Sequence, residues 1–214
     1  MTINSIIFDL DNTLYDENVY LELVFTEFFK KNNIDYDISS ILTDKFRLKA
    51  NDIFGEVLKD INEYSHKKQE ALFELYKYIN CKISLYDDAY DLISFLNIKN
   101  IKLGIITNGV IEAQKNKVKC LDLETKIDKI IYARSWGKEF EKPNPRPFAE
   151  ALKLLKAKPS EVLYIGDNPK TDIMGAKAIG IKSVRYLNGY LKNIQCNDTH
   201  NIKRLIEIKK YIES

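Results

Sequence analysis

Two aspartates separated by one residue follow the first apolar run of the chain. Asp9 and Asp11 come directly after residues 3–8, whose β-branched side chains are typical of a strand buried on both faces of a parallel sheet. Alternate residues of an extended chain project to the same side, so the two carboxylates are expected to lie close together. Such a pair repels unless a proton or a divalent cation intervenes, and a hard cation such as Mg²⁺ prefers oxygen ligands. The pattern indicates either a cation site or a turn in which Asp11 and Asn12 cap the next helix.

A second acidic segment, residues 166–172, lies between another apolar run and a helical pattern. Asp167 stands at the expected strand tip. Asp172 lies near the start of the following helix, where a negative charge favours the positive end of the helix dipole. Helix capping explains Asp172 but not an aspartate at the strand tip. Because open α/β sheets bind ligands beyond the carboxyl ends of their strands, Asp167 is expected to bring a further carboxylate to that crevice.

Two further segments supply groups that bind anions. Thr107, Asn108 and Gly109 end a strand-like run and open a helix, so the backbone amides at that helix start would form an anion pocket. Lys142 precedes a proline in a loop before another helix and could be aimed at the same crevice. Lys138, four residues earlier, is a competitor for that role.

The elements that must position these residues alternate between strands and helices. Apolar runs predict strands at 3–8, 101–107, 129–132 and 161–166, with a weaker one at 181–184. Helical patterns lie between them, at roughly 88–97, 110–120, 146–155 and 171–179. This alternation predicts an α/β fold with a doubly wound, mainly parallel sheet. Leu205, Ile206, Ile208 and Ile212 predict a final amphipathic helix.

One interval, residues 17–81, shows only helical spacing. Apolar residues spaced by three and four positions predict three helices there, marked by Leu21, Val24, Phe25 and Phe28, by Phe46, Ala50, Ile53 and Val57, and by Leu72, Leu75, Tyr76 and Ile79. The aromatic stripe is interpreted as core packing rather than a ligand wall. We therefore predict a small all-helical domain over 17–81, inserted into a core formed by residues 1–16 and 82–214.

Composition narrows the classes of function. The chain has 214 residues, 45% hydrophobic and 30% charged, with a formal net charge of +2, as in a globular protein. Such balanced charge argues against a nucleic-acid partner, and no stretch of about 18 apolar residues suggests a membrane span. Three cysteines without metal-ligand spacing, and no recognisable signal segment, make the cytoplasm the expected location.

In order, spacing and strand context, the four polar segments resemble the motifs of the haloacid dehalogenase-like (HAD) phosphohydrolase superfamily. The matching residues are Asp9-Leu10-Asp11-Asn12-Thr13, Thr107-Asn108-Gly109, Lys142-Pro143, and Gly166-Asp167 followed by Asp172. The resemblance implies a Rossmann-like core, and it makes the helical insertion a cap of the C1 type.

The resemblance also implies the chemistry. Asp9 would be the nucleophile that forms an aspartyl-phosphate intermediate. Asp11 would be the general acid for the leaving alcohol and then the general base for water. Mg²⁺ would be held by the Asp9 carboxylate, the backbone carbonyl of Asp11 and the Asp167 carboxylate.

Binding of the phosphoryl group is implied for a second set of residues. The Thr107 hydroxyl, the Asn108 backbone and Lys142 would contact the phosphoryl oxygens. Asp172 would orient Lys142 or a metal-bound water. In many relatives a glycine stands three positions before the Lys-Pro pair, where this chain has Glu139.

Differences within the superfamily favour one reaction. Metal-independent dehalogenases lack the second aspartate, which this chain has as Asp11, and hexose phosphate mutases typically carry other residues in place of Asn12 and Thr13. The expected activity is hydrolysis of a small phosphomonoester, and a sugar phosphate mutase or a non-catalytic binding protein of the same fold are the alternatives.

Outside the motifs, a few polar residues could contribute to specificity. Arg47, the insertion's only arginine, could bind a carboxylate or phosphate, or be solvated. Tyr15, Asp16 and Glu17, near the hinge, could touch substrate.

Overall fold

A six-stranded parallel sheet forms the larger part of the molecule. The computed structural model describes residues 2–197 and 199–212. The strand order is β3-β2-β1-β4-β5-β6, and every pair is parallel. The strands are β1 (Ser5–Phe8), β2 (Lys102–Thr107), β3 (Lys129–Tyr132), β4 (Val162–Gly166), β5 (Lys182–Tyr186) and β6 (His200–Ile202). The predicted strands are present, and β6 is an edge strand that the apolar pattern did not indicate.

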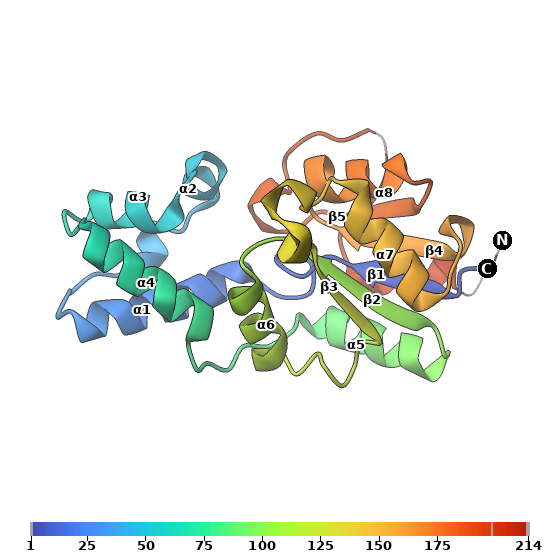
Figure 1. Ribbon diagram of the computed structural model, residues 1–214, viewed down its shortest axis with the longest axis horizontal. Coiled ribbons are helices and arrows are strands. Elements are labelled where there is room, and N and C mark those ends of the chain that lie inside the picture. Colours follow the sequence, from blue (N-terminus) through green and yellow to red (C-terminus); the bar gives the residue numbers. More distant parts are fainter. Residues whose placement is uncertain (1, 198, 213–214) are drawn as a thin grey trace.

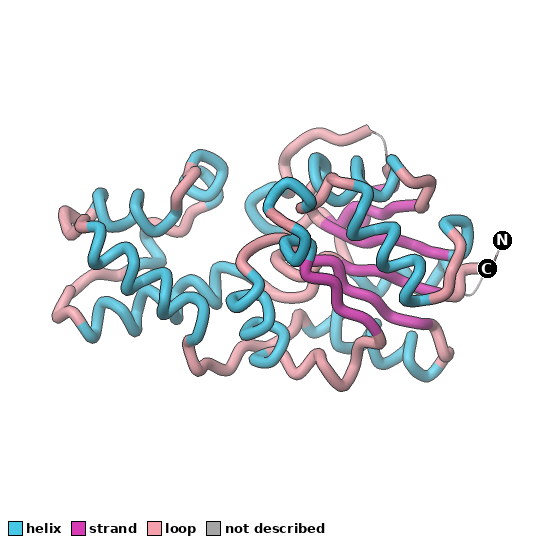
Figure 2. The backbone as a smooth tube through the Cα atoms, in the orientation of Figure 1, coloured by secondary structure: helices cyan, strands magenta, loops and turns pink. Residues whose placement is uncertain are grey.

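Helices cover both faces of the sheet, as Figures 1 and 2 show. Alternation along β1 separates two buried clusters: Ile6 and Phe8 pack on one face, and Ile7 on the other. The first face is covered by α5 (Asp87–Ile98), α6 (Ile111–Cys120) and the C-terminal segment, and the second by α7 (Pro145–Leu155) and α8 (Met174–Ala178). The predicted doubly wound α/β fold is confirmed.

An all-helical insertion lies to one side of the sheet, between β1 and α5 (Figure 1). It consists of α1 (Glu17–Lys31), a 3₁₀ turn (Ile38–Ser40), α2 (Asp44–Lys49), α3 (Ile53–Asp60) and α4 (His66–Tyr78). Phe25 and Phe28 of its aromatic stripe are buried in the core, as interpreted from the sequence. Phe54 packs against the rings of Phe25, Phe73 and Tyr76, and Phe54, Phe73 and Tyr76 also line a cavity inside the insertion.

The prediction of one helix through Phe46, Ala50, Ile53 and Val57 is wrong. The chain leaves the helix at Ala50, and the Asp52 side chain accepts from the Gly55 amide at 3.2 Å to begin α3. An N-cap aspartate starts a new helix even where the apolar spacing continues.

Two other segments depart from regular α-helix. A π-helical turn (Pro169–Ile173) precedes α8, so the predicted helix over 171–179 is α-helical only in its second half. The predicted C-terminal α-helix is a 3₁₀ helix (Leu205–Tyr211) with Leu205 and Ile208 buried. Residues three positions apart eclipse in a 3₁₀ helix, so this pair shares one face.

The three cysteines are free thiols, and the sulfurs of Cys81 and Cys120 lie 3.2 Å apart. Within residues 2–197 and 199–212, no helix combines the length and the apolar character that a bilayer crossing requires.

Candidate active site

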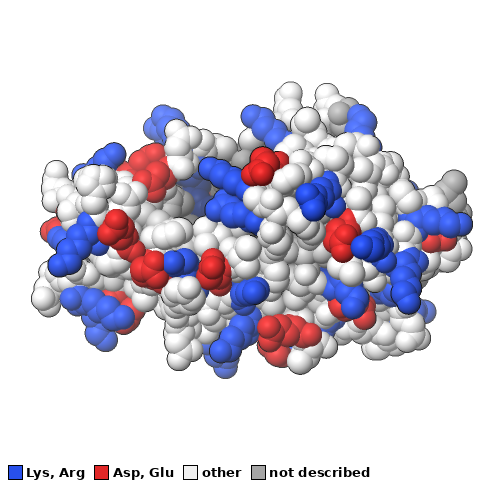
Figure 3. All heavy atoms as spheres, in the orientation of Figure 1, with Lys and Arg blue, Asp and Glu red and all other residues white. Residues whose placement is uncertain are grey.

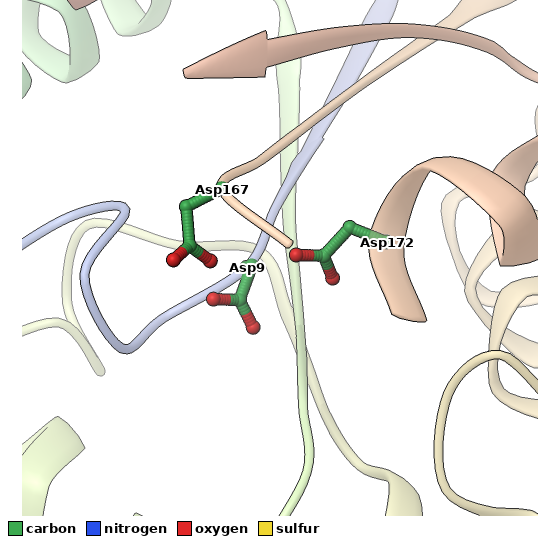
Figure 4. Close-up of side chains that lie close together, drawn as sticks. All are labelled: Asp9, Asp167 and Asp172. Carbon is green, nitrogen blue, oxygen red and sulfur yellow. The ribbon is translucent and has the colours of Figure 1, made fainter. Parts of the chain in front are cut away.

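Three aspartates meet at the carboxyl ends of β1 and β4. Asp9 follows β1 and Asp167 follows β4, and the two strands are neighbours, with Phe8 opposite Ile165. The Asp9 amide donates to the Ile165 carbonyl at 2.8 Å, which extends the pairing by one residue. Asp172 approaches from the π-helical turn, and one carboxylate oxygen from each of the three aspartates lies within 4.8 Å of the other two. Figure 4 shows the three side chains together. The structure thus brings Asp9, Asp167 and Asp172 together.

Asp172 is fixed by one residue of β4 and by one of the segment that follows it. The Tyr164 hydroxyl donates to Asp172 Oδ1 at 2.8 Å, and the Asn168 amide donates to Oδ2 at 3.0 Å. Gly166 leaves room for this arrangement, because a Cβ at that position would lie 2.5 Å from the Asp172 carboxyl carbon. The glycine before Asp167 therefore has a steric reason: it leaves room for the carboxylate of Asp172.

Lys142 reaches into the centre of the cluster. Its ammonium group donates to Asp172 Oδ1 at 2.7 Å and to the Ile106 carbonyl at 2.9 Å, and it also contacts Asp9 Oδ1. The Asn108 side chain holds the backbone of Lys142 on both sides, with its Oδ1 accepting the amide at 2.8 Å and its Nδ2 donating to the carbonyl at 3.0 Å. Lys138, the alternative considered from the sequence, is exposed, so Lys142 is the lysine that contacts the aspartates.

Negative charge exceeds positive charge in this cluster. Burial, together with Asp172 and Asp11, raises the pKa of Asp9 to about 7, although Lys142 acts in the opposite direction. Burial and the charges of Asp9 and Asp172 hold the pKa of Asp167 well above its ordinary value. Burial lowers the pKa of Lys142, but the two carboxylates it contacts outweigh this and raise it overall. A divalent cation would remove this imbalance.

The donor set fits a hard cation. All three groups are carboxylates, and oxygen is the ligand that Mg²⁺ prefers. Asp172 already accepts from three donors, whereas the Asp167 carboxylate forms no hydrogen bond among the described residues. Asp9 and Asp167 therefore have the most free oxygen lone pairs to offer.

Asp11 is turned away from the cluster, toward α6. Its Oδ1 accepts from the Tyr15 hydroxyl at 2.5 Å and from Lys117 Nζ at 2.7 Å, and its Oδ2 accepts from Gln114 Nε2 at 2.7 Å. Asp11 does not cap α1: the cap is Asp16, whose side chain accepts from the Asn18 amide at 2.9 Å. The capping alternative is thus wrong for Asp11, whereas the Asn12 side chain does accept from the amide of Glu17, the first residue of α1, at 3.3 Å.

Gln114 and Lys117 were missed from the sequence. They lie three residues apart on α6, and both are buried. Their spacing after the Thr107 segment places them on one helix face, a signal that a search for buried polar pairs could have used. Gln114 also contacts the Thr107 hydroxyl, so it ties the end of β2 to Asp11.

The expected anion pocket after β2 already contains a carboxylate of the protein. Gly109, at a φ of 109°, donates its amide to Glu141 Oε1 at 2.7 Å, and Arg134 donates to the same oxygen at 2.8 Å. A glycine is required at this positive φ. The Thr107 hydroxyl donates to the Asn108 carbonyl at 3.3 Å.

A cavity of about 190 Å³ opens over the carboxylates. Its lining includes Asp9, Asp11, Asn12, Glu17, Asn108, Lys142, Asp167, Asn168, Thr171, Asp172, Tyr190 and Leu191. A second cavity, of about 530 Å³, lies inside the helical insertion, and Glu17 lines both. Figure 3 shows the surface hollowed between the insertion and the sheet-bearing part of the molecule.

Arg47 is buried rather than solvated. Its guanidinium pairs with Glu17, donates to Asn18 Oδ1 at 2.6 Å and lies 4.6 Å from the centre of the Tyr190 ring. Burial alone would raise the pKa of Glu17, but Arg47 and Lys117 lower it to about 2. Arg47 is therefore an internal ion-pair partner in this structure.

Arg185, also missed from the sequence, is fully buried behind Asp167. It donates to the carbonyls of Asp167 at 3.0 Å, Leu191 at 2.7 Å and Ile194 at 2.5 Å. It thereby fixes the backbone at the strand tip and the segment that carries Tyr190.

Comparison with known proteins gives consistent matches. Residues 6–186 match the family described as haloacid dehalogenase-like hydrolase. A glyceraldehyde 3-phosphate phosphatase of Methanocaldococcus jannaschii is 26% identical, with 99% of each chain covered. The pyrophosphatase PpaX of Anoxybacillus flavithermus is 29% identical over 86% of this chain and 83% of its own. The crystal structure of YfnB from Bacillus subtilis, a HAD-hydrolase bound to magnesium, superposes with a TM-score of 0.72 at 22% identity, with both chains fully covered.

Proposed function

Because the chain belongs to the haloacid dehalogenase-like hydrolase family, we propose that it is a Mg²⁺-dependent phosphomonoester hydrolase that acts through an aspartyl-phosphate on Asp9. The observation that carries the proposal is the buried cluster of Asp9, Asp167 and Asp172 around Lys142. Of the similar proteins named above, one is a phosphatase and one a pyrophosphatase by name, which supports hydrolytic release of phosphate as the reaction.

Asp9 has the position of a nucleophile. It lies at the strand tip, lines the smaller cavity and is held by Lys142 and by the Thr13 hydroxyl at 3.3 Å. We assign the cation to the Asp9 carboxylate, the Asp167 carboxylate and the backbone carbonyl of Asp11. When bound, Mg²⁺ would offset the charge of the carboxylates and of the phosphoryl oxygens. It would also favour the ionised, nucleophilic form of Asp9 over the protonated form that burial favours.

Three other groups would bind the phosphoryl oxygens. These are the Lys142 ammonium, the Thr107 hydroxyl and the Asn108 backbone, and Asp172 would orient Lys142. Asn108 also fixes the backbone of Lys142 through its side-chain amide, so one residue would serve both as a donor and as a support. Donors fixed before the reaction stabilise transition-state charge without reorganisation.

Asp11 would transfer the protons. It lines the same cavity as Asp9, and its carboxylate is held by groups from outside the cluster. It would protonate the leaving oxygen when the aspartyl-phosphate forms, and would take a proton from water when that intermediate is hydrolysed.

The helical insertion would act as the cap. We propose residues 17–81 as this cap and residues 1–16 and 82–214 as the core. The cavity of about 190 Å³ at the carboxylates has room for a phosphoryl group, which fits a small phosphorylated metabolite whose remaining part faces the insertion. The cytoplasmic location expected from the sequence stays a prediction.

Phosphate release tests the proposal. The protein is assayed with p-nitrophenyl phosphate and a panel of metabolite phosphomonoesters, with Mg²⁺ and with EDTA, and Asp9→Asn is the control. Release that needs both Mg²⁺ and Asp9 is expected. A wild-type protein as inactive as Asp9→Asn across the panel contradicts the proposal, and isomerisation of a hexose phosphate faster than its hydrolysis would establish the mutase alternative instead.

A further inference from the structure

Lys117 is a fully buried lysine that belongs to the core but contacts the insertion. It lies on α6, and its side chain has no exposed surface. Its ammonium donates to Asp11 Oδ1 at 2.7 Å and to Glu17 Oε1 at 3.2 Å. Glu17 is the first residue of α1, where the chain enters the insertion. The Lys117 ammonium therefore bridges Asp11, the proposed acid–base group, and Glu17, at the start of the insertion.

Two aromatic rings of the insertion complete the surroundings of Lys117. The ammonium lies 5.3 Å from the centre of the Tyr20 ring on α1 and 5.1 Å from that of Tyr76 on α4. Burial lowers the pKa of Lys117, but Asp11, Tyr76 and Glu17 outweigh this and hold it well above its ordinary value. The lysine is thus a permanent cation whose contacts come from both parts of the molecule.

We propose that Lys117 is a positioning residue that orients the carboxylate of Asp11 and links that orientation to the placement of the cap through Glu17. The proposal rests on the function proposed above. A displacement of α1 would remove Glu17 and Tyr20 from Lys117 and leave Asp11 as its main partner. A cap that returns would share the ammonium between two carboxylates and so loosen its hold on Asp11.

A series of ion pairs continues this link further into the cap. Glu17 also pairs with Arg47 on α2, so positive and negative groups alternate from Asp11 to Lys117, Glu17 and Arg47. Asp11 would keep the Tyr15 and Gln114 hydrogen bonds if Lys117 were replaced. Loss of Lys117 should therefore misdirect the carboxylate rather than unfold the site.

Leaving-group dependence separates this role from a purely structural one. A p-nitrophenolate ion departs with little help from an acid, whereas an alkoxide needs a proton in the transition state. The ratio kcat/KM reports the step that forms the aspartyl-phosphate. For Lys117→Met we expect this ratio to fall at least about tenfold more for an alkyl phosphate, such as glycerol phosphate, than for p-nitrophenyl phosphate.

The matched control is Lys119→Met, which replaces an exposed lysine on the same helix. Its kcat/KM for the alkyl phosphate and for p-nitrophenyl phosphate should equal those of the wild type. Lys117→Arg, which keeps the positive charge, should recover part of the alkyl phosphate activity. It also serves as the second variant if Lys117→Met folds poorly. Equal losses with the two esters, or no loss, would overturn the positioning role.

Amide hydrogen exchange tests the link to the cap without relying on turnover. Lys117→Met should exchange faster than the wild type over residues 11–21, while Lys119→Met should not. Unchanged exchange over that segment would overturn the link. A wild-type protein as inactive as Asp9→Asn on these esters and on the whole phosphomonoester panel would instead contradict the proposed function, and with it the catalytic part of this inference.

Discussion

Replacing Lys142 by methionine removes a buried charge while preserving most of the side-chain volume. Lys142 is 4% exposed, and its ammonium contacts both Asp9 and Asp172. Methionine is unbranched and of similar length, so it fills the channel that the lysine stem occupies. The substitution therefore tests the role of the ammonium rather than that of packing.

The structure indicates how much stability this costs. Removing one partner of a buried ion pair costs about 3–5 kcal/mol, because a charge is left without compensation. Asp172 retains the Tyr164 hydroxyl and the Asn168 amide, whereas Asp9 retains only the Thr13 hydroxyl among the donors named above. The pKa of Asp9 is already raised to about 7, and loss of Lys142 raises it further, so a proton replaces the lysine near neutral pH and limits the loss.

We therefore expect Lys142→Met to lose about 3 kcal/mol of unfolding free energy at pH 7.5 in EDTA. The loss should be smaller at pH 5.5, where Asp9 is protonated in both proteins. Turnover should fall by about 10²–10³-fold, the effect of losing one donor to transition-state charge.

Urea unfolding followed by circular dichroism measures the first effect, and phosphate release measures the second. Lys138→Met, in the same loop and exposed, is the control and should change neither. A loss below about 1 kcal/mol at pH 7.5, or the same loss at both pH values, would refute the assignment of Lys142 as the counter-charge of the cluster.

Three further predictions concern the same cluster. Arg185→Met removes one donor from the carbonyls of Asp167, Leu191 and Ile194, of which Leu191 keeps the Ile194 amide, and should cost about 2 kcal/mol in urea unfolding, with weaker Mg²⁺ binding by calorimetry because the backbone of Asp167 is released. Gly166→Ala places a Cβ 2.5 Å from the Asp172 carboxyl carbon, so kcat should fall at least about tenfold in the phosphatase assay, and unchanged kcat would contradict this steric role. Because the folded state raises the pKa of Asp9 from 3.8 to about 7, and raises that of Asp167 too, it binds these protons more tightly than the unfolded state. The metal-free protein should thus lose stability as the pH rises from about 5 to about 7.5, and unfolding free energies in EDTA that rise over this interval would contradict the charge excess.

The sheet and the aspartates at its edge could be predicted because their signals are local. β-Branched runs are typical of buried parallel strands, and Asp9 and Asp167 directly follow two of them. Their meeting depends on β1 and β4 being neighbours, which the apolar pattern does not encode. The motif resemblance implied that Asp9 and Asp167 share a cation, and gave no strand order.

The buried cations could not be predicted in the same way. Lys117 and Arg185 have partners that are distant in sequence or belong to backbone carbonyls, as with the 106 positions between Lys117 and Asp11. A lysine on a helix has the same sequence pattern whether it faces water or a carboxylate. Arg47 shows the same difficulty, since a solvated side chain is the usual outcome for a helix arginine, and its contacts with Glu17, Asn18 and Tyr190 become visible only in the structure.

Each of the two aspartates of the first motif, Asp9 and Asp11, has its own buried lysine as counter-charge. Lys142 contacts Asp9 from the loop before α7, and Lys117 contacts Asp11 from α6. Both are buried, so their charges are little screened by solvent. Lys142 is held by Asn108 within the core, whereas Lys117 shares its charge with Glu17 at the hinge. Asp9, the proposed nucleophile, is thus held by groups of the core, while Asp11, the proposed proton-transfer group, is held by a lysine that also contacts the insertion. A cap movement would then alter proton transfer while leaving Asp9 in position; the leaving-group experiment on Lys117 tests the first part of this coupling, and hydrogen exchange tests the link to the cap.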